Sequence, residues 1–185
     1  MRYSVTALLG EEPVTAKEVR ERLHLLPGNS DEETYTILPL ITAAREYCES
    51  RAGYAFIRQR ITAWPSAEEL AAGEFYLPRP PVTEIEGVAV CGASGGQAAL
   101  SGWQLIADDG PLVLDTSGLS GARAVDPVAV TYTAGAESCP EMAKQAMLLL
   151  IGHWYMHREA VVTGSAPAEV ALTVDALLRQ YRRWW

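Results

Sequence analysis

The hydrophobic period of the sequence changes twice along the chain, and this limits the folds that the chain can adopt. Residues 30–53 and 138–159 repeat their apolar side chains every three to four positions, as amphipathic helices do. Residues 57–62 and 128–132 instead alternate large apolar side chains with polar or small ones, which is typical of strands. Closely spaced turn signals between those strands favour hairpins over crossover helices. We therefore expect an α+β fold that is mainly α-helical: a bundle of about four helices with a small antiparallel β region inserted at roughly 56–133.

The length and composition of the chain suit one domain. Its 185 residues include 49% hydrophobic side chains, which is enough for a single core. We expect one domain over residues 1–185, in which 1–55 and 138–185 form the helical core and 56–133 the β insertion.

Three patterns of the capping-box type mark where helices should begin. Each has Ser or Thr followed three residues later by Glu, and they start at Thr15, Ser30 and Ser138. Inside the second helix, Pro39 should kink the helix or split it, because proline has no backbone N–H. In the same helix, Arg45 and Glu49 are expected to face away from the buried side.

Two histidines four residues apart raise the possibility of a metal centre. His153 and His157 would point only about 40° apart on a helix, close enough to share a ligand. A zinc hydrolase helix of this kind needs glutamate directly after the first histidine as its general base, and Trp154 stands there instead. The nearest acid, Glu159, lies on another face of the helix. We expect packed histidines with no metal and no catalytic residue, and we keep a metal-dependent hydrolase using His153 and His157 as an alternative.

The helix that carries these histidines is apolar nearly all round. Leu148, Ile151 and Tyr155 form a second apolar stripe on the side opposite the histidines. A helix with two apolar sides lies in the centre of a core or is shared with a partner protein. We therefore take Leu148, Ile151 and Tyr155 as a candidate subunit interface.

The C-terminus combines basic and aromatic side chains in a chain whose formal net charge is −8. Arginine and tryptophan are favoured anchors at protein interfaces, so this segment is a candidate docking element for a partner. Its residues are Arg179, Tyr181, Arg182, Arg183, Trp184 and Trp185. A nucleic-acid-binding module using the three arginines is an alternative, but the acidic balance argues against it because phosphate binding needs a positive surface.

Other features of the sequence exclude several classes of protein. Cys48, Cys91 and Cys139 include no CxxC pair, which fits reduced packing residues better than a disulfide frame. The chain has no GK[ST] phosphate loop and no GxSxG elbow, so we expect no cofactor and no enzyme activity. The N-terminus lacks the apolar core of a signal peptide, and no stretch of about 18 apolar residues could span a membrane. We expect the chain to fold in the cytoplasm.

Taken together, six segments of the chain resemble the head-tail connector (neck adaptor) proteins of long-tailed bacteriophages. They occur in family order and cover almost the whole chain. The segments are EEPVTAKEVRERLHL, ITAAREYCESRAGYAFIRQR, FYLPRPPV, VTYTAG, CPEMAKQAMLLLIGHWYMHREAVVTG and DALLRQYRR. The most specific parts are LPRPPV and residues 132–164.

This resemblance implies a structural virion protein without catalytic activity. It implies a homo-oligomer, a dodecameric ring that joins the portal protein to a downstream stopper or tail-completion protein. Genomic DNA would pass through the channel of the ring without specific binding. The protein would be assembled in the host cytoplasm and would reside in the neck of the virion. The C-terminal helix would dock on the portal, and the hairpin tips of the β region would contact the downstream partner.

Overall fold

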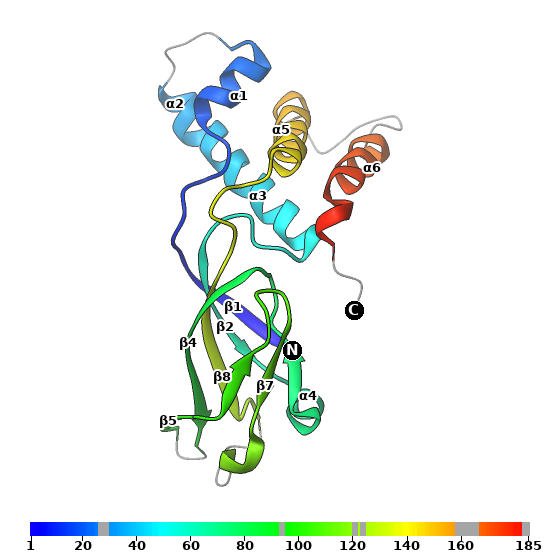
Figure 1. Cartoon of the computed structure of the whole chain (residues 1–185). Coiled ribbons are helices and arrows are strands. Elements are labelled where there is room, and N and C mark those ends of the chain that lie inside the picture. The colour runs from blue at the N-terminus through cyan, green and yellow to red at the C-terminus, as the bar shows by residue number, and fades with distance from the viewer. Residues whose placement is uncertain (26–29, 93–94, 120–121, 123–124, 158–166, 183–185) are drawn as a thin grey trace. The chain divides into compact units, whose positions relative to one another are not determined.

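A computed structural model of the chain contains two compact units (Figure 1). The structure describes residues 1–25, 30–92, 95–119, 122, 125–157 and 167–182. The sheet unit comprises Met1–Gly10 and Ile57–Glu137, and the helical unit comprises Glu11–Phe56 and Ser138–Trp185. In the described parts of the chain, no helix is long and apolar enough to cross a membrane.

The sheet unit contains one five-stranded and one three-stranded antiparallel sheet. The larger has the strand order β1-β2-β8-β4-β5, and the smaller has the order β3-β7-β6. The strands are β1 (Arg2–Leu8), β2 (Gln59–Trp64), β3 (Glu74–Tyr76), β4 (Val82–Cys91), β5 (Gln97–Ala99), β6 (Trp103–Leu105), β7 (Pro111–Leu114) and β8 (Val128–Ala134). The unit also holds α4 (Ala67–Ala72) and the short 3₁₀ helix η2 (Thr116–Leu119).

The prediction of a mainly helical bundle with a small β insertion at 56–133 was therefore wrong. The β part is a compact unit of its own with two sheets, and it includes a strand from the N-terminus, β1. Two physical reasons explain the error. Three of the strands have only three residues, too few to show a period, and β1 is an edge strand whose side chains are mostly exposed.

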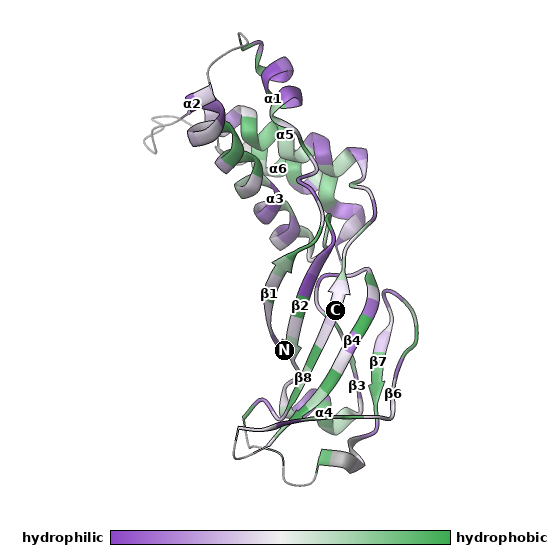
Figure 2. Cartoon of the chain, turned by 90° about the vertical axis from the view of Figure 1, so that its left-hand side faces the viewer, coloured by the Kyte–Doolittle hydropathy of each residue, from purple (hydrophilic) through white to green (hydrophobic). Residues whose placement is uncertain are grey.

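Alternation along the strands gives both sheets one buried face. In the larger sheet, Ile61, Val88, Val130 and Tyr132 are buried, and in the smaller sheet Leu112 is fully buried. In Figure 2, green hydrophobic stretches alternate with pale or purple ones along β4 and β8. On the opposite face, which we call the open face, Arg60 and Thr62 of β2 and Thr131 of β8 are exposed or half-buried, whereas Ala129 and Thr133 of β8 are buried.

The helical unit contains the two segments that lie before and after Ile57–Glu137 in the sequence. Its elements are α1 (Ala16–Leu23), α2 (Ser30–Glu32), the π-helix η1 (Glu33–Ile37), α3 (Leu38–Ala52), α5 (Glu141–Met156), α6 (Pro167–Leu178) and the 3₁₀ helix η3 (Arg179–Tyr181). The capping box at Thr15 is confirmed, since both of its hydrogen bonds are formed. The prediction of a capping box at Ser138 was wrong, because Pro140 is the residue before α5 and no side chain caps that helix.

Pro39 is accommodated by a local change of helix type. It lies in the first turn of α3, and η1, the π-helix, ends just before it. A proline ring clashes with the carbonyl four residues earlier in a regular α-helix, and a π-helix widens that turn. The helical run therefore continues through Pro39 with an altered geometry.

Helix α5 lies at the centre of the helical unit. It packs against α1, α3 and α6, and it buries Ala143, Ala146, Met147, Leu150 and Ile151. Neighbours on three sides explain why the sequence of α5 is apolar nearly all round.

Candidate interaction surfaces

The two histidines lie side by side at the end of α5. Their ring centroids are 4.6 Å apart, and Nδ1 of His157 lies 3.0 Å from the carbonyl oxygen of His153. Among the described residues, no group of three His, Cys, Asp or Glu side chains could hold a metal, and Glu159 falls outside them. Trp154 packs edge-on against Tyr47 with ring centroids 6.1 Å apart. The position that a zinc hydrolase would give to its general base therefore serves packing.

The candidate subunit interface on α5 lies largely beneath other elements of the same chain. Ile151 is 1% exposed, and Leu148 is half-buried against the helical core. The Tyr155 hydroxyl donates a hydrogen bond to Oε1 of Glu32 in α2. The contact of these three residues with another subunit stays a prediction.

The C-terminal segment is held to the helical unit by Tyr181. Its ring lies 5.6 Å from the Tyr54 ring and 5.5 Å from the Phe56 ring, between centroids. The Gln180 side-chain amide also donates a hydrogen bond to the Tyr181 hydroxyl at 2.8 Å. Arg179 is exposed and Arg182 is half-buried. The other predicted docking residues, Arg183, Trp184 and Trp185, lie outside the described residues.

A buried charge network in α3 was missed by sequence reasoning. Arg45 is 1% exposed; its Nε donates to Glu12 at 2.9 Å and its Nη1 donates to Glu49 at 3.0 Å. The other oxygen of Glu49 accepts the backbone N–H of Phe56 at 3.0 Å. Burial alone would lower the pKa of Arg45, but the hydrogen bonds and charges of Glu12 and Glu49 outweigh it and raise that pKa. The i,i+4 spacing of Arg45 and Glu49 was the available signal, but charged residues are seldom buried.

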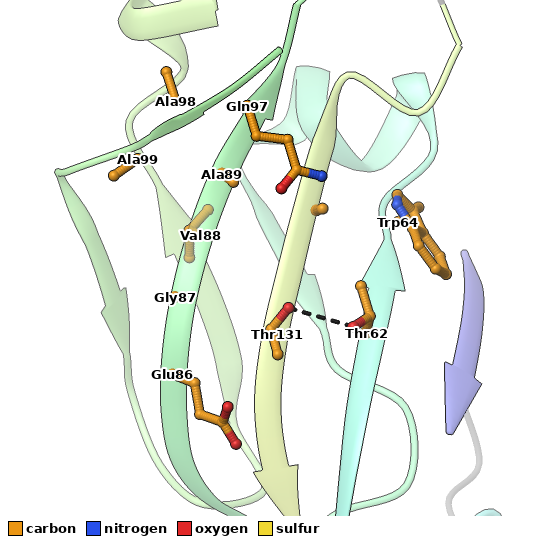
Figure 3. Close-up of a pocket in the computed structure, with 11 residues that line it drawn as sticks. Thr62, Trp64, Glu86, Gly87, Val88, Ala89, Gln97, Ala98, Ala99 and Thr131 are labelled. Atoms are coloured by element: carbon orange, nitrogen blue, oxygen red, sulfur yellow. Dashed lines mark hydrogen bonds between the residues drawn. The ribbon is translucent and has the colours of Figure 1, made fainter. Parts of the chain in front are cut away.

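The open face of the larger sheet contains a hollow of about 610 Å³ (Figure 3). Its floor is made of small side chains, and Trp64 stands at one side. The lining residues are Thr62, Trp64, Glu86, Gly87, Val88, Ala89, Gln97, Ala98, Ala99, Ala129 and Thr131. The hydroxyls of Thr62 and Thr131 lie 3.3 Å apart across neighbouring strands.

Glu86 is the ionisable residue of this hollow, and it already has partners. Arg60 donates to it at 2.8 Å, and so does the Thr133 hydroxyl at 2.8 Å. The hydrogen bond from Arg60 is the main cause that lowers the pKa of Glu86. Glu86 is thus a paired carboxylate, and the lining of the hollow includes no histidine that could act as a base for the threonine hydroxyls, which suits a contact surface.

The comparison with protein families identifies the chain. A family model described as head completion protein matches residues 14–182. The chain belongs to the head completion protein family. The matched residues include most of both units, so the family resemblance is not confined to the helices. The prediction of a phage head-tail connector or head completion family is confirmed.

Three similar solved structures come from gene transfer agent (GTA) particles, and each comparison covers 100% of this chain and 97% of the other. A chain in the neck of an empty GTA particle, computed with C6 symmetry, is 24% identical to this chain, with a TM-score of 0.73. The virion of a native GTA particle has 24% identity and a TM-score of 0.71. The neck of a native particle, computed with C12 symmetry, has 21% identity and a TM-score of 0.70. At this identity the similarity concerns the fold. The comparison with curated proteins finds no match.

Proposed function

We propose that this head completion protein is a structural component of the virion neck, a ring-forming connector that joins the portal to the next neck or tail component. The observation that carries the proposal is the family match over residues 14–182. The fold similarity to chains of GTA neck structures, which extends over the whole chain, supports it. In this role the protein leaves a channel through which DNA passes.

We further propose that the ring is dodecameric. One of the similar neck structures was computed with C12 symmetry and another with C6 symmetry, and twelve copies are compatible with both. The formal net charge of −8 suits a channel for DNA, because an acidic surface does not retain phosphate groups.

A role without catalysis agrees with the chemistry of the described side chains. Burial is the main cause that raises the pKa of Cys48 and that of Cys139 to about 12, so both are protonated thiols at neutral pH and poor nucleophiles.

Two surfaces are proposed for the partners of the ring. The C-terminal segment, with Arg179, Tyr181, Arg182, Arg183, Trp184 and Trp185, faces the portal. The proposal is supported by the three arginines of the segment in an acidic chain, and by Tyr181, whose ring packs against other aromatic rings and so anchors the segment to the helical unit. The sheet unit, with its open face and hairpin tips, contacts the downstream stopper or tail-completion protein.

The proposed function is tested by measuring the mass of the purified protein alone and with isolated portal. Analytical ultracentrifugation and negative-stain images should show a closed ring, either in solution or only on the portal. A protein that remains monomeric at high concentration and does not bind portal would contradict the proposal. Stoichiometric zinc in a metal assay would instead favour the hydrolase alternative.

A further inference from the structure

The outer side of α6 carries a row of exposed residues. We call this row, Leu172, Ala176 and Arg179, the outer α6 stripe. Leu172 is 68% exposed, and the Arg179 guanidinium makes no hydrogen bond or ion pair with any described residue. The inner side of the same helix is occupied, because Val174 and Leu178 are fully buried. The stripe is therefore not needed for the core of its own subunit.

A second exposed row lies on the helical run that begins at residue 30. We call this row, Asp31, Tyr35 and Leu38, the outer η1 stripe. Tyr35 is 78% exposed and is among the most exposed large apolar side chains of the described residues. Leu38 is 46% exposed. Asp31 is also exposed and belongs to a short acidic run with Glu32 and Glu33.

The two stripes belong to different sides of the helical unit. Helix α6 packs on α5 and α3, whereas η1 packs on α1, α2 and α3. In Figure 1, α2 and α6 lie on opposite sides of α5. A head-to-tail contact that closes a ring needs two different patches on each subunit, and patches on opposite sides satisfy that need.

We propose that the outer α6 stripe of one copy packs against the outer η1 stripe of the next copy around the ring. This inference rests on the proposed function and names the contact that builds the ring. Under this inference Arg179 contacts the neighbouring copy instead of the portal, and the rest of the proposed docking segment, residues 181–185, remains for the portal.

The spacing, size and charge of the stripes match in an antiparallel arrangement. The two ends of each stripe are seven positions apart, which is about 10 Å along a helix. Leu172 then lies opposite Leu38 of the next copy, and Arg179 lies opposite Asp31 of the next copy. Between these ends, the small Ala176 faces the large Tyr35. In such an interface the apolar contact contributes affinity, and the charge pair at its rim fixes the orientation of the two copies.

A charge-swap experiment tests this contact. Ring assembly is measured by analytical ultracentrifugation, alone and with portal, for the wild type, Arg179→Asp, Asp31→Arg and the double variant. Each single reversal places like charges together and should raise the protein concentration needed for assembly about tenfold or more. The double variant restores opposite charges and should recover assembly. Arg58→Asp reverses an exposed arginine of the sheet unit and should assemble as the wild type does.

A second variant covers the case in which Asp31→Arg disturbs the start of α2. Ala176→Arg inserts a long side chain into the proposed contact from an exposed position, and it should block assembly without lowering the Tm. The inference is overturned if the wild type forms rings and Arg179→Asp and Ala176→Arg form them equally well. It is also overturned if the double charge swap is no better than the single reversals, or if the wild type forms closed dimers. A wild type that assembles in neither condition contradicts the proposed function itself.

Discussion

Gly135 occupies a position that admits no side chain. Its φ is +121°, and a Cβ placed on it would lie 2.0 Å from the carbonyl oxygen of Ile57. Its N–H donates to the carbonyl oxygen of Pro81 at 2.8 Å. The backbone after β8 therefore runs against the segment that leads into β2, and only glycine permits this approach.

We expect Gly135→Ala to lower the free energy of unfolding by about 3 kcal/mol or more, because the methyl group must displace backbone atoms and the φ is strained for alanine. Gly87→Ala is the matched control, since a Cβ there would meet no atom within 4 Å. Urea unfolding followed by circular dichroism measures both variants. Equal stability of the two would contradict the close approach at Gly135.

In the helical unit, Arg45 is a second position that tolerates little change, because its buried charge is paired with two glutamates. We expect Arg45→Met to lower the free energy of unfolding by about 3–5 kcal/mol, because Glu49 is fully buried and would lose its charged partner. Arg51→Met is the control, because Arg51 pairs with Asp175 at the surface, where screening by water makes the pair weak. The urea midpoint of this variant should change little. The same urea series tests both, and an unchanged midpoint for Arg45→Met would refute the role of the network.

At the scale of elements, the sequence predicts helices with strong local signals and misses elements that depend on distant partners. The Thr15 box has its full pattern, and Thr15 and Glu18 form both bonds. The Ser138 pattern is equally good, but Pro140 sets the start of α5 and leaves the box unformed. Strand β1 is stabilised by pairing with β2, some fifty residues later in the chain, and nothing near residues 2–8 announces that pairing.

This contrast gives a prediction for the two boxes. We expect Thr15→Ala to lower the free energy of unfolding by about 1 kcal/mol, because an N-cap hydroxyl is lost, and Ser138→Ala to have little effect. Thermal unfolding followed by circular dichroism measures both. A loss at Ser138 as large as that at Thr15 would contradict the capping seen at the start of α5.

The Thr15 box should also depend on pH. The backbone N–H of Thr15, followed by its hydroxyl, donates to Glu18 and lowers the pKa of that carboxyl below its ordinary value. A lowered pKa in the folded state adds stability above the unfolded pKa, and this is lost as the pH falls through the folded pKa. We therefore expect Glu18→Gln to have a lower Tm than the wild type at about pH 7 and to approach it at about pH 3. A constant difference in Tm at both pH values would refute this linkage.

At the scale of the whole molecule, the order of segments was more informative than any single site. The six segments that resemble connector proteins lie in both units, and the family match over residues 14–182 covers nearly all of them. The candidate metal site was less informative. His153 and His157 lie close together, but the contact of Trp154 with Tyr47 gives that part of α5 a packing role. The buried Arg45 network could not be predicted because one of its members, Glu12, is distant in sequence, and the burial of Arg45 and Glu49 depends on the folded structure.

The C-terminal segment can be tested for portal binding without damage to the fold, because the structure shows where to shorten it. Removal of residues 179–185 would take away Tyr181, which packs against Tyr54 and Phe56. A chain that ends at Arg182 keeps this contact and loses only residues 183–185. We expect the shortened chain to keep the Tm of the wild type and to bind isolated portal about tenfold or more weakly, because one arginine and two tryptophans are lost from the docking surface. Sedimentation with portal measures this, with Arg58→Asp as the control, and unchanged binding of the shortened chain would refute a docking role for its last three residues.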